Sequence, residues 1–237
     1  MLIIAIFLAV VAQEDILPPL EDDILTDNIH IGTPEEAKEY LKNRHLVTLP
    51  TTYDPIADND PCLPPIMYQG VCGSCYAFAA SYVFSYRICK SGVRDSPFAP
   101  NVQELVTCDT VNYGCDGGDS TATFRYISRY GIGPSTCKAY ENNTATTSGL
   151  GACTLNTCDD DSITSIKYFC RKGTATYYRD FELDSVDVLE ELIKTEIYTN
   201  GAVVSSIITE GSNAIFTGYS TADSGHVFTT PANNEAA

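Results

Sequence analysis

The stretch QGVCGSCYAFAA, residues 69–80, constrains this chain more than any other feature of its sequence. Apolar side chains recur at spacings of three and four from Phe78 to Cys89, which predicts a buried helix. Ser74 stands at the expected N-cap, so Cys75 falls in the first turn. A thiol there meets unpaired backbone N–H groups and the positive end of the helix dipole, and both favour the thiolate. The pattern therefore predicts a nucleophilic cysteine.

The residues just before this cysteine suggest a catalytic loop. The side-chain amide of Gln69 can donate to an oxyanion if the loop folds back over the thiol, and Gly70 and Gly73 permit such a turn. Cys72 is then a structural cysteine that pins the turn. Three other interpretations of Cys72 and Cys75 stay open, namely a redox pair, half of a zinc site and two disulfide cysteines. No second CxxC or paired histidine accompanies them, so we expect no metal and no other cofactor.

Composition limits the class of protein. A chain of 237 residues with 44% apolar and 19% charged residues is typical of a globular protein with a core. The net charge of −17, with no Lys/Arg cluster, argues against nucleic acid and against an anionic membrane surface as partners. Ten cysteines favour an oxidising compartment, and the sequon at Asn142 is compatible with the same route.

The chain divides into three segments by composition. Residues 1–12, MLIIAIFLAVVA, are typical of a signal peptide, and the alternative of a membrane anchor requires about 20 apolar residues. Residues 13–48 are acidic and contain one predicted helix, which Thr33 can cap. A turn-rich stretch then leads into residues 49–237.

Periodicity in the third segment predicts further elements. We expect helices at 101–106, 122–130 and 185–198, and a strand at 202–209. Helices that precede strands along the chain favour an α+β fold in two lobes.

Four segments resemble, in order and spacing, the papain-family cysteine proteases of the cathepsin B branch: QGVCGSCYAF, SYVFSYRIC, LVTCDTVNYGCDGGDS and NGAVV. The resemblance runs from about Leu49 to about Phe228. It implies a papain-like two-lobe fold, with a helical left lobe and a β-rich right lobe, and a cysteine-type peptidase acting on peptide or protein substrates. Cys75 would be the nucleophile and Gln69 the oxyanion donor.

The resemblance also assigns the residues of NYGCDGGDS. Gly117 and Gly118 would line the cleft and bind substrate backbone, although a simple turn is an alternative for the pair. Asp119 follows them, and we hypothesise that its carboxylate favours basic residues in a nearby subsite. The family's cross-links imply four disulfides and leave Cys153 without a partner: Cys62 with Cys89, Cys72 with Cys115, Cys108 with Cys158, and Cys137 with Cys170.

The same resemblance implies how the protein is processed and where it is located. The acidic segment would be a short propeptide that occupies the cleft as an inhibitor until it is removed. The mature product would be a monomer, secreted or held in a lysosome-like or vacuolar compartment, with no membrane contact once the signal peptide is gone. No histidine lies between Cys137 and Cys170, so the occluding loop of cathepsin B is not supported, and we expect an endopeptidase rather than a dipeptidyl carboxypeptidase.

Two departures from the family pattern matter. Tyr76 stands where the family has tryptophan. His226 lies 151 residues after Cys75, a spacing that suits the general base. Its context, IFTGYSTADSGHVF, instead resembles the hairpin before the catalytic histidine, which implies a peptidase domain that is incomplete at its C-terminus. The chain is therefore either a cysteine protease or a catalytically inactive paralogue or fragment that binds peptides or protease partners.

Overall fold

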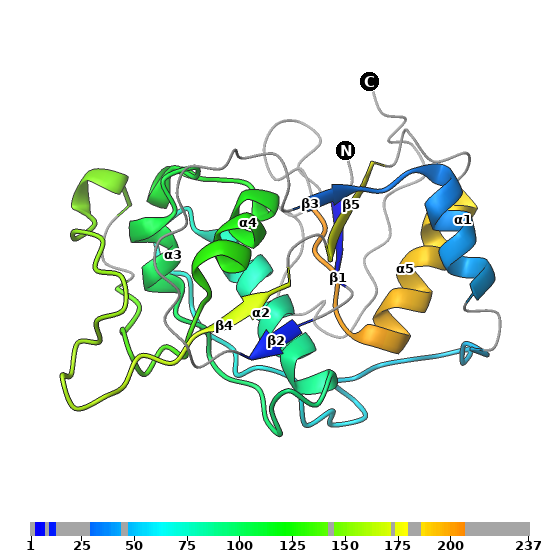
Figure 1. The fold of residues 1–237 in the computed structure, drawn as a ribbon, viewed down its shortest axis with the longest axis horizontal. Helices are drawn as coiled ribbons and strands as arrows, with labels where there is room; N and C mark the ends of the chain where they lie inside the picture. Colours follow the sequence, from blue (N-terminus) through cyan, green and yellow to red (C-terminus); the bar gives the residue numbers. More distant parts are fainter. Residues whose placement is uncertain are drawn as a thin grey trace, which may run out of the picture.

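The computed structural model describes residues 3–7, 10–12, 29–43, 47–141, 145–171, 174–179 and 186–206. Figure 1 shows two groups of helices with small sheets between them. The larger group holds three helices: α2 (Cys75–Lys90), α3 (Val102–Cys108) and α4 (Ser120–Tyr130). The short 3-10 turns η1 (Gly114–Asp116) and η2 (Thr147–Gly149) lie in the loops around them.

The main core forms where α2 packs against α3 and α4. Its fully buried large side chains come from all three helices and from the segment just after α4: Phe84, Ile88, Leu105, Phe124, Ile127 and Ile132. Each such side chain contributes about 1.5–3 kcal/mol through loss of water contact. Because both faces of α2 are covered, its N-terminus is held at a fixed place in the fold.

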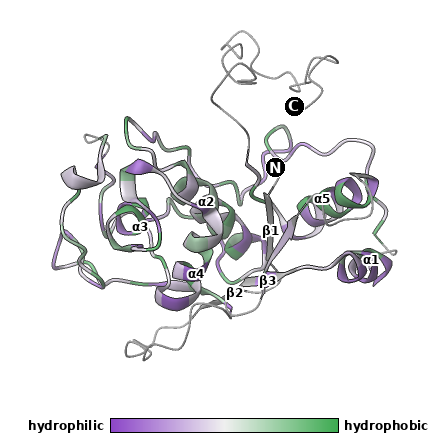
Figure 2. Cartoon of the chain, turned by 90° about the horizontal axis from the view of Figure 1, so that it is seen from above, coloured by the Kyte–Doolittle hydropathy of each residue, from purple (hydrophilic) through white to green (hydrophobic). Residues whose placement is uncertain are grey.

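The second group consists of α1 (Pro34–Asn43) and α5 (Val186–Asn200), which lie side by side in Figures 1 and 2. The predicted cap of α1 is confirmed, since the Glu36 amide donates to Thr33 Oγ1 and the Glu36 carboxylate accepts from the Thr33 amide. Ala37 of α1 packs with Leu189 and Leu192 of α5. The helix of the acidic segment is thus an integral part of this cluster.

The described strands form two small sheets. In the first, β5 (Ala175–Arg179) lies between β1 (Ile3–Phe7), which is antiparallel to it, and β3 (Ile29–Ile31), which is parallel. In the second, β2 (Val10–Ala12) pairs antiparallel with β4 (Tyr168–Cys170). Residues of the predicted signal peptide therefore form strands in this structure, and its removal stays a prediction.

The helices predicted at 101–106, 122–130 and 185–198 are confirmed, and the α+β class with them. Asn101 caps α3 by accepting from the Glu104 amide, and Gly131 ends α4 with φ +70°, a backbone conformation that favours glycine. The strand predicted at 202–209 is not seen in the part of it that the structure describes. Within its described part, residues 202–206, only an isolated bridge at Val204 forms.

Four disulfides join all but two of the ten cysteines. Cys62–Cys89 and Cys72–Cys115 are the expected pairs. The other two expectations were wrong: the structure joins Cys108 to Cys153 and Cys137 to Cys158, and leaves Cys170 as a free, buried thiol on β4. The physical reason is placement, because β4 packs Cys170 into the main core while Cys153 and Cys158 lie in the long loop that crosses Cys108 and Cys137.

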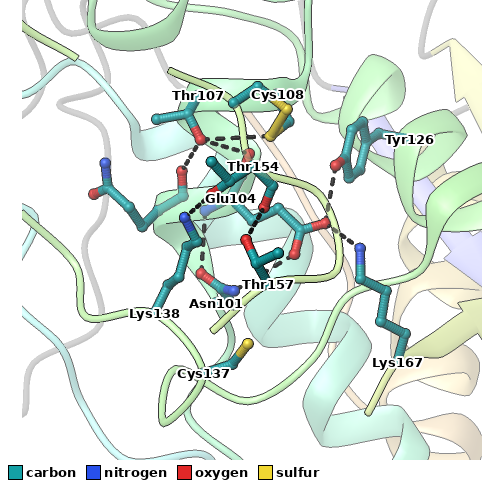
Figure 3. A network of polar contacts seen from close by, with 12 residues as sticks. Asn101, Glu104, Thr107, Cys108, Tyr126, Cys137, Lys138, Thr154, Thr157 and Lys167 are labelled. Carbon is teal, nitrogen blue, oxygen red and sulfur yellow. Dashed lines mark hydrogen bonds and ion pairs between the residues drawn. A yellow bond between two sulfur atoms is a disulfide. The ribbon is translucent and has the colours of Figure 1, made fainter. Parts of the chain in front are cut away.

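A buried carboxylate organises the same side of the molecule. Glu104 of α3 accepts from Tyr126 of α4 at 2.9 Å and from Lys167 Nζ at 2.6 Å, as Figure 3 shows. In the Lys167–Glu104 ion pair, Glu104 is buried and the Lys167 side chain is 9% exposed. Loss of either partner would leave a charge without compensation in the core, so this network fixes the segment before β4 against α3 and α4. Among the residues described, no helix has the length and apolar character needed to cross a membrane.

Candidate active site

Cys75 is the first residue of α2, exposed to solvent and outside any disulfide. Its neighbour Cys72 is buried and bonded to Cys115. This bond leaves Cys72 unable to form a redox pair with Cys75 or to bind zinc, and it leaves one free thiol at the helix N-terminus. Backbone N–H groups of the first turn have no partner within the helix and stabilise a negative charge placed there.

The loop before the thiol is pinned by backbone contacts as well as by the disulfide. The Gly73 amide donates to the Cys115 carbonyl at 2.9 Å. A Cβ at position 73 would lie 2.5 Å from that oxygen, so the close approach requires glycine. The same Cβ position lies 3.5 Å from the Gly117 amide nitrogen, which places the GG segment directly beside the loop that carries Cys75.

Gln69 is held at the start of this loop. Its side-chain nitrogen donates to the Cys72 carbonyl at 2.6 Å. A primary amide carries two protons, so one remains for an oxyanion. The structure thus keeps Gln69 and Cys75 on one short, cross-linked loop. The predicted donation from Gln69 to an oxyanion formed at Cys75 requires such proximity.

Ser74 occupies the predicted N-cap, but its side chain does not cap the helix. Its hydroxyl lies 2.7 Å from the hydroxyl of Tyr140 instead, and Tyr140 in turn donates to the Gln69 carbonyl at 2.9 Å. Sequence reasoning missed Tyr140 because it lies 66 residues from Ser74 along the chain, and no local pattern marks such a contact.

Gly117 and Gly118 form a tight turn beside the thiol loop. Gly117 has φ +107°, which strains any side chain, and its carbonyl accepts from the Tyr113 amide. A Cβ at Gly118 would lie 2.4 Å from Asn112 Oδ1. Both glycines are therefore required by the turn itself. Their binding of substrate backbone stays a prediction.

Asp119 is the N-cap of α4. Its carboxylate accepts from the amides of Thr121 and Ala122 and from the Thr121 hydroxyl. This gives the residue a structural role that the sequence analysis did not assign to it. Its hypothesised selection of basic substrate residues has to be tested with the cap preserved.

Tyr76 fills the position where the family has tryptophan. Its hydroxyl donates to the Gly114 carbonyl at 3.0 Å, and its backbone carbonyl accepts from Ser120 Oγ at 3.2 Å. Burial raises the pKa of Tyr76 well above its usual range, with smaller contributions from Asp109, Cys75 and Tyr140, so it stays neutral. The tyrosine ties the first turn of α2 to the turn that holds the two glycines.

Two predicted site residues, His226 and Asn142, lie outside the described residues. The structure therefore describes Cys75 and Gln69, whose roles as nucleophile and oxyanion donor stay predictions, but not the predicted base. Within the described ranges, no group of three or more His, Cys, Asp or Glu side chains is arranged to hold a metal ion.

Comparison with known proteins agrees with this geometry. A family model described as papain family cysteine protease matches residues 49–233. Cathepsin B-like CP2 of Giardia intestinalis is 28% identical over 144 residues, which are 61% of this chain and 45% of the relative. Cathepsin B-like CP1 of the same organism is 35% identical over 39% of this chain and 30% of its own length.

Two further comparisons cover more of the chain. Cathepsin B of Dictyostelium discoideum is 26% identical over 75% of this chain and 60% of that protein. The solved structure of proCathepsin B S9 from Trypanosoma congolense aligns with a TM-score of 0.53 at 24% identity, over 73% of this chain and 54% of the other. The latter supports the papain-like fold. The chain spans less than two thirds of the length of each of these relatives.

Proposed function

We propose that this chain, which belongs to the papain family of cysteine proteases, hydrolyses peptide bonds with the Cys75 thiolate as nucleophile. One observation carries the proposal. Cys75 is an exposed free thiol on the first residue of a helix whose N-terminus is fixed by the Cys72–Cys115 disulfide. That environment surrounds the sulfur with backbone N–H groups and holds it in one place.

The reaction follows from this arrangement in two steps. The base, for which His226 is our candidate, takes the thiol proton, and Cys75 Sγ attacks the carbonyl carbon of the substrate. The oxyanion that forms accepts from the Gln69 amide. The base then gives the proton to the leaving amine, and water cleaves the resulting thioester, which releases the acid and restores the thiol.

The substrate would lie along the turn of Gly117 and Gly118. That turn is next to the thiol loop, and a Cβ at Gly117 would meet nothing within 4 Å, so this side of the turn has room for an extended peptide. The sequence between Cys137 and Cys170 contains no histidine, which favours cleavage within chains over removal of C-terminal dipeptides.

Processing and location are part of the same proposal. Residues 1–12 would act as a signal peptide and residues 13–48 as a propeptide. Four disulfides support a secreted or lysosome-like location for a monomeric product. The docking of α1 on α5 supports a segment that stays attached to the enzyme until it is removed.

A second function is favoured by two departures from the family pattern. Tyr76 in place of tryptophan, together with the sequence around His226, is compatible with a catalytically inactive paralogue or fragment that binds peptides or protease partners. Such a protein would keep the cleft and lose the proton transfer.

Hydrolysis of a fluorogenic peptide amide by the full chain tests the proposal. Wild type should turn over, and Cys75→Ala should fall to the uncatalysed background. If His226 is the base, His226→Ala should lose several orders of magnitude in kcat, as other triads do. Wild-type hydrolysis that Cys75→Ala leaves intact would contradict the proposal, and peptide binding without any hydrolysis would support the second function.

A further inference from the structure

Tyr140 lies against both ends of the loop that carries the proposed catalytic groups. Its hydroxyl donates to the Gln69 carbonyl at 2.9 Å and lies 2.7 Å from Ser74 Oγ. Its ring meets the Phe78 ring edge-on, with centroids 5.0 Å apart and an interplanar angle of 86°. Tyr140 therefore contacts the residue that bears the oxyanion amide, the residue before the nucleophile and the first turns of α2.

The direction of each hydrogen bond follows from counting protons. A phenol has one proton, and the Gln69 carbonyl can only accept, so the Tyr140 proton lies in that bond. The Ser74 hydroxyl must then donate to the Tyr140 oxygen. Burial raises the pKa of Tyr140, against a smaller lowering by the bond to Ser74, so the phenol stays protonated at neutral pH. The result is a directed chain from Ser74 through Tyr140 to Gln69.

Ser74 has no other evident reason to be polar. It is fully buried, and it makes no side-chain cap bond to α2 although it stands at the N-cap. A buried hydroxyl without a partner is costly, so its bond to Tyr140 fixes both groups. The disulfide at Cys72 pins the middle of the loop, and Tyr140 fixes the two ends.

We propose that Tyr140 is a positioning residue, which holds the Gln69 amide and the N-terminus of α2 at the separation that the oxyanion of the substrate requires. This inference rests on the proposed function for its effect on rate, but its effect on the loop is independent of activity. Tyr140 acts through Gln69, so loss of its hydroxyl should cost less than the ~100-fold that loss of an oxyanion donor costs.

The test uses the full chain with Tyr140→Phe, which keeps the ring against Phe78 and removes the hydroxyl. Peptide-amide hydrolysis should lose about tenfold in kcat with little change in KM, because the interaction matters in the transition state. Alkylation of Cys75 by iodoacetamide forms no oxyanion and should change less than about twofold. Tyr86→Phe is the matched control, since it removes a tyrosine hydroxyl bond, to Asp60, from a later turn of the same helix.

Amide hydrogen exchange tests the positioning role whether or not the chain is active. The Gly73 and Ser74 amides, which donate to the Cys115 and Cys72 carbonyls, should exchange about tenfold faster in Tyr140→Phe and unchanged in Tyr86→Phe. If wild type does not hydrolyse peptides but these amides still exchange faster in Tyr140→Phe than in wild type, the proposed function is overturned and the positioning role is kept. Unchanged exchange, or a kcat equal to that of wild type, would overturn the positioning role.

Ser74→Ala provides a second variant. It breaks the same chain of bonds at its other end, so the double variant with Tyr140→Phe should be little worse than the worse of the two single variants. Fully additive losses in exchange protection would mean that the two hydroxyls act separately, which contradicts the chain.

Discussion

Arg87 of α2 donates to Glu196 of α5 at 2.7 Å, and the two side chains are 3% and 0% exposed. The guanidinium also donates to the carbonyls of Gly201 and Ala202. The carboxylate also accepts from Tyr40 of α1 and from Asn200. The buried ion pair therefore joins the helix that carries Cys75 to α5, and the Tyr40 hydroxyl adds α1 of the acidic N-terminal segment.

Removal of one member of this pair should destabilise the fold strongly. Arg87→Leu and Glu196→Leu should each lower the free energy of unfolding by about 3–5 kcal/mol, because each leaves a buried charge without its partner. Urea denaturation measures both, and the double variant should lose less than the sum of the two by at least ~1 kcal/mol. Lys194→Ala is the control, since its pair with Glu190 is exposed to solvent and its loss should change the free energy of unfolding little. Additive losses would show that the pair is not coupled.

The bond from Tyr40 to Glu196 should hold α1 in place. Hydrogen bonds to buried charges contribute about 1.5–3 kcal/mol, so Tyr40→Phe should raise the rate of tryptic cleavage after Lys42 by about tenfold or more. Tyr198→Phe is a suitable control, because that tyrosine lies on α5 and packs edge-on against Tyr53. Equal cleavage rates in the two variants would mean that Tyr40 does not retain the helix.

The two free thiols should differ sharply in reactivity. Cys75 is exposed, whereas Cys170 is 1% exposed, and burial raises the pKa of Cys170 to about 12. Iodoacetamide at neutral pH should therefore modify Cys75 alone, and Cys170 only after denaturation. Peptide mapping of the alkylated protein reads both sites. Modification of Cys170 in the folded protein would contradict its placement in the core.

The Cys170 thiol also predicts a pH dependence of stability. Its folded pKa is raised above the unfolded value of about 8.5, so only the unfolded chain forms the thiolate between these values. Stability is thus unaffected below about pH 8.5 and falls as pH rises toward 12. With Cys75 blocked, wild type should lose about 2 kcal/mol more than Cys170→Ala between pH 8.5 and 10. Parallel losses in the two proteins would contradict this assignment.

The charge of Asp119 can be separated from its capping role. Asp119→Asn keeps an acceptor for the α4 amides, whereas Asp119→Ala also loses the cap, at a cost of about 1 kcal/mol. If the carboxylate selects basic substrate residues, both variants should shift the ratio of kcat/KM for basic over neutral peptides equally. An unchanged ratio in Asp119→Asn would remove the hypothesis and leave the residue its structural role.

Local patterns predicted the local features of this molecule. Apolar periodicity predicted α2, α4 and α5, and Thr33 at the start of its helix predicted a cap. The motif around Cys75 predicted a cysteine in the first turn of a helix, where the structure has it as an exposed free thiol. These features depend on residues within a few turns of one another, so the sequence records them directly.

Contacts between distant segments were not predictable in this way. The partners of Cys108 and Cys137 depend on how the loop of residues 145–167 crosses the helices, and neither Tyr140 beside Ser74 nor Glu196 beside Arg87 leaves a periodic signal. The pairing of β1 with β5 was missed for a related reason, since an apolar run indicates burial without indicating its partner.

The most direct test of the central claim is reaction of the full chain with a peptidyl epoxide, followed by mapping of the modified residue. We predict rapid modification of Cys75 alone, which is abolished in Cys75→Ser and slowed by peptide substrate. The peptide part of the reagent binds where the substrate binds, and so brings the epoxide to an activated thiolate. Modification no faster than that of a free thiol in a small peptide, and insensitive to substrate, would contradict the assignment of Cys75 as a catalytic nucleophile.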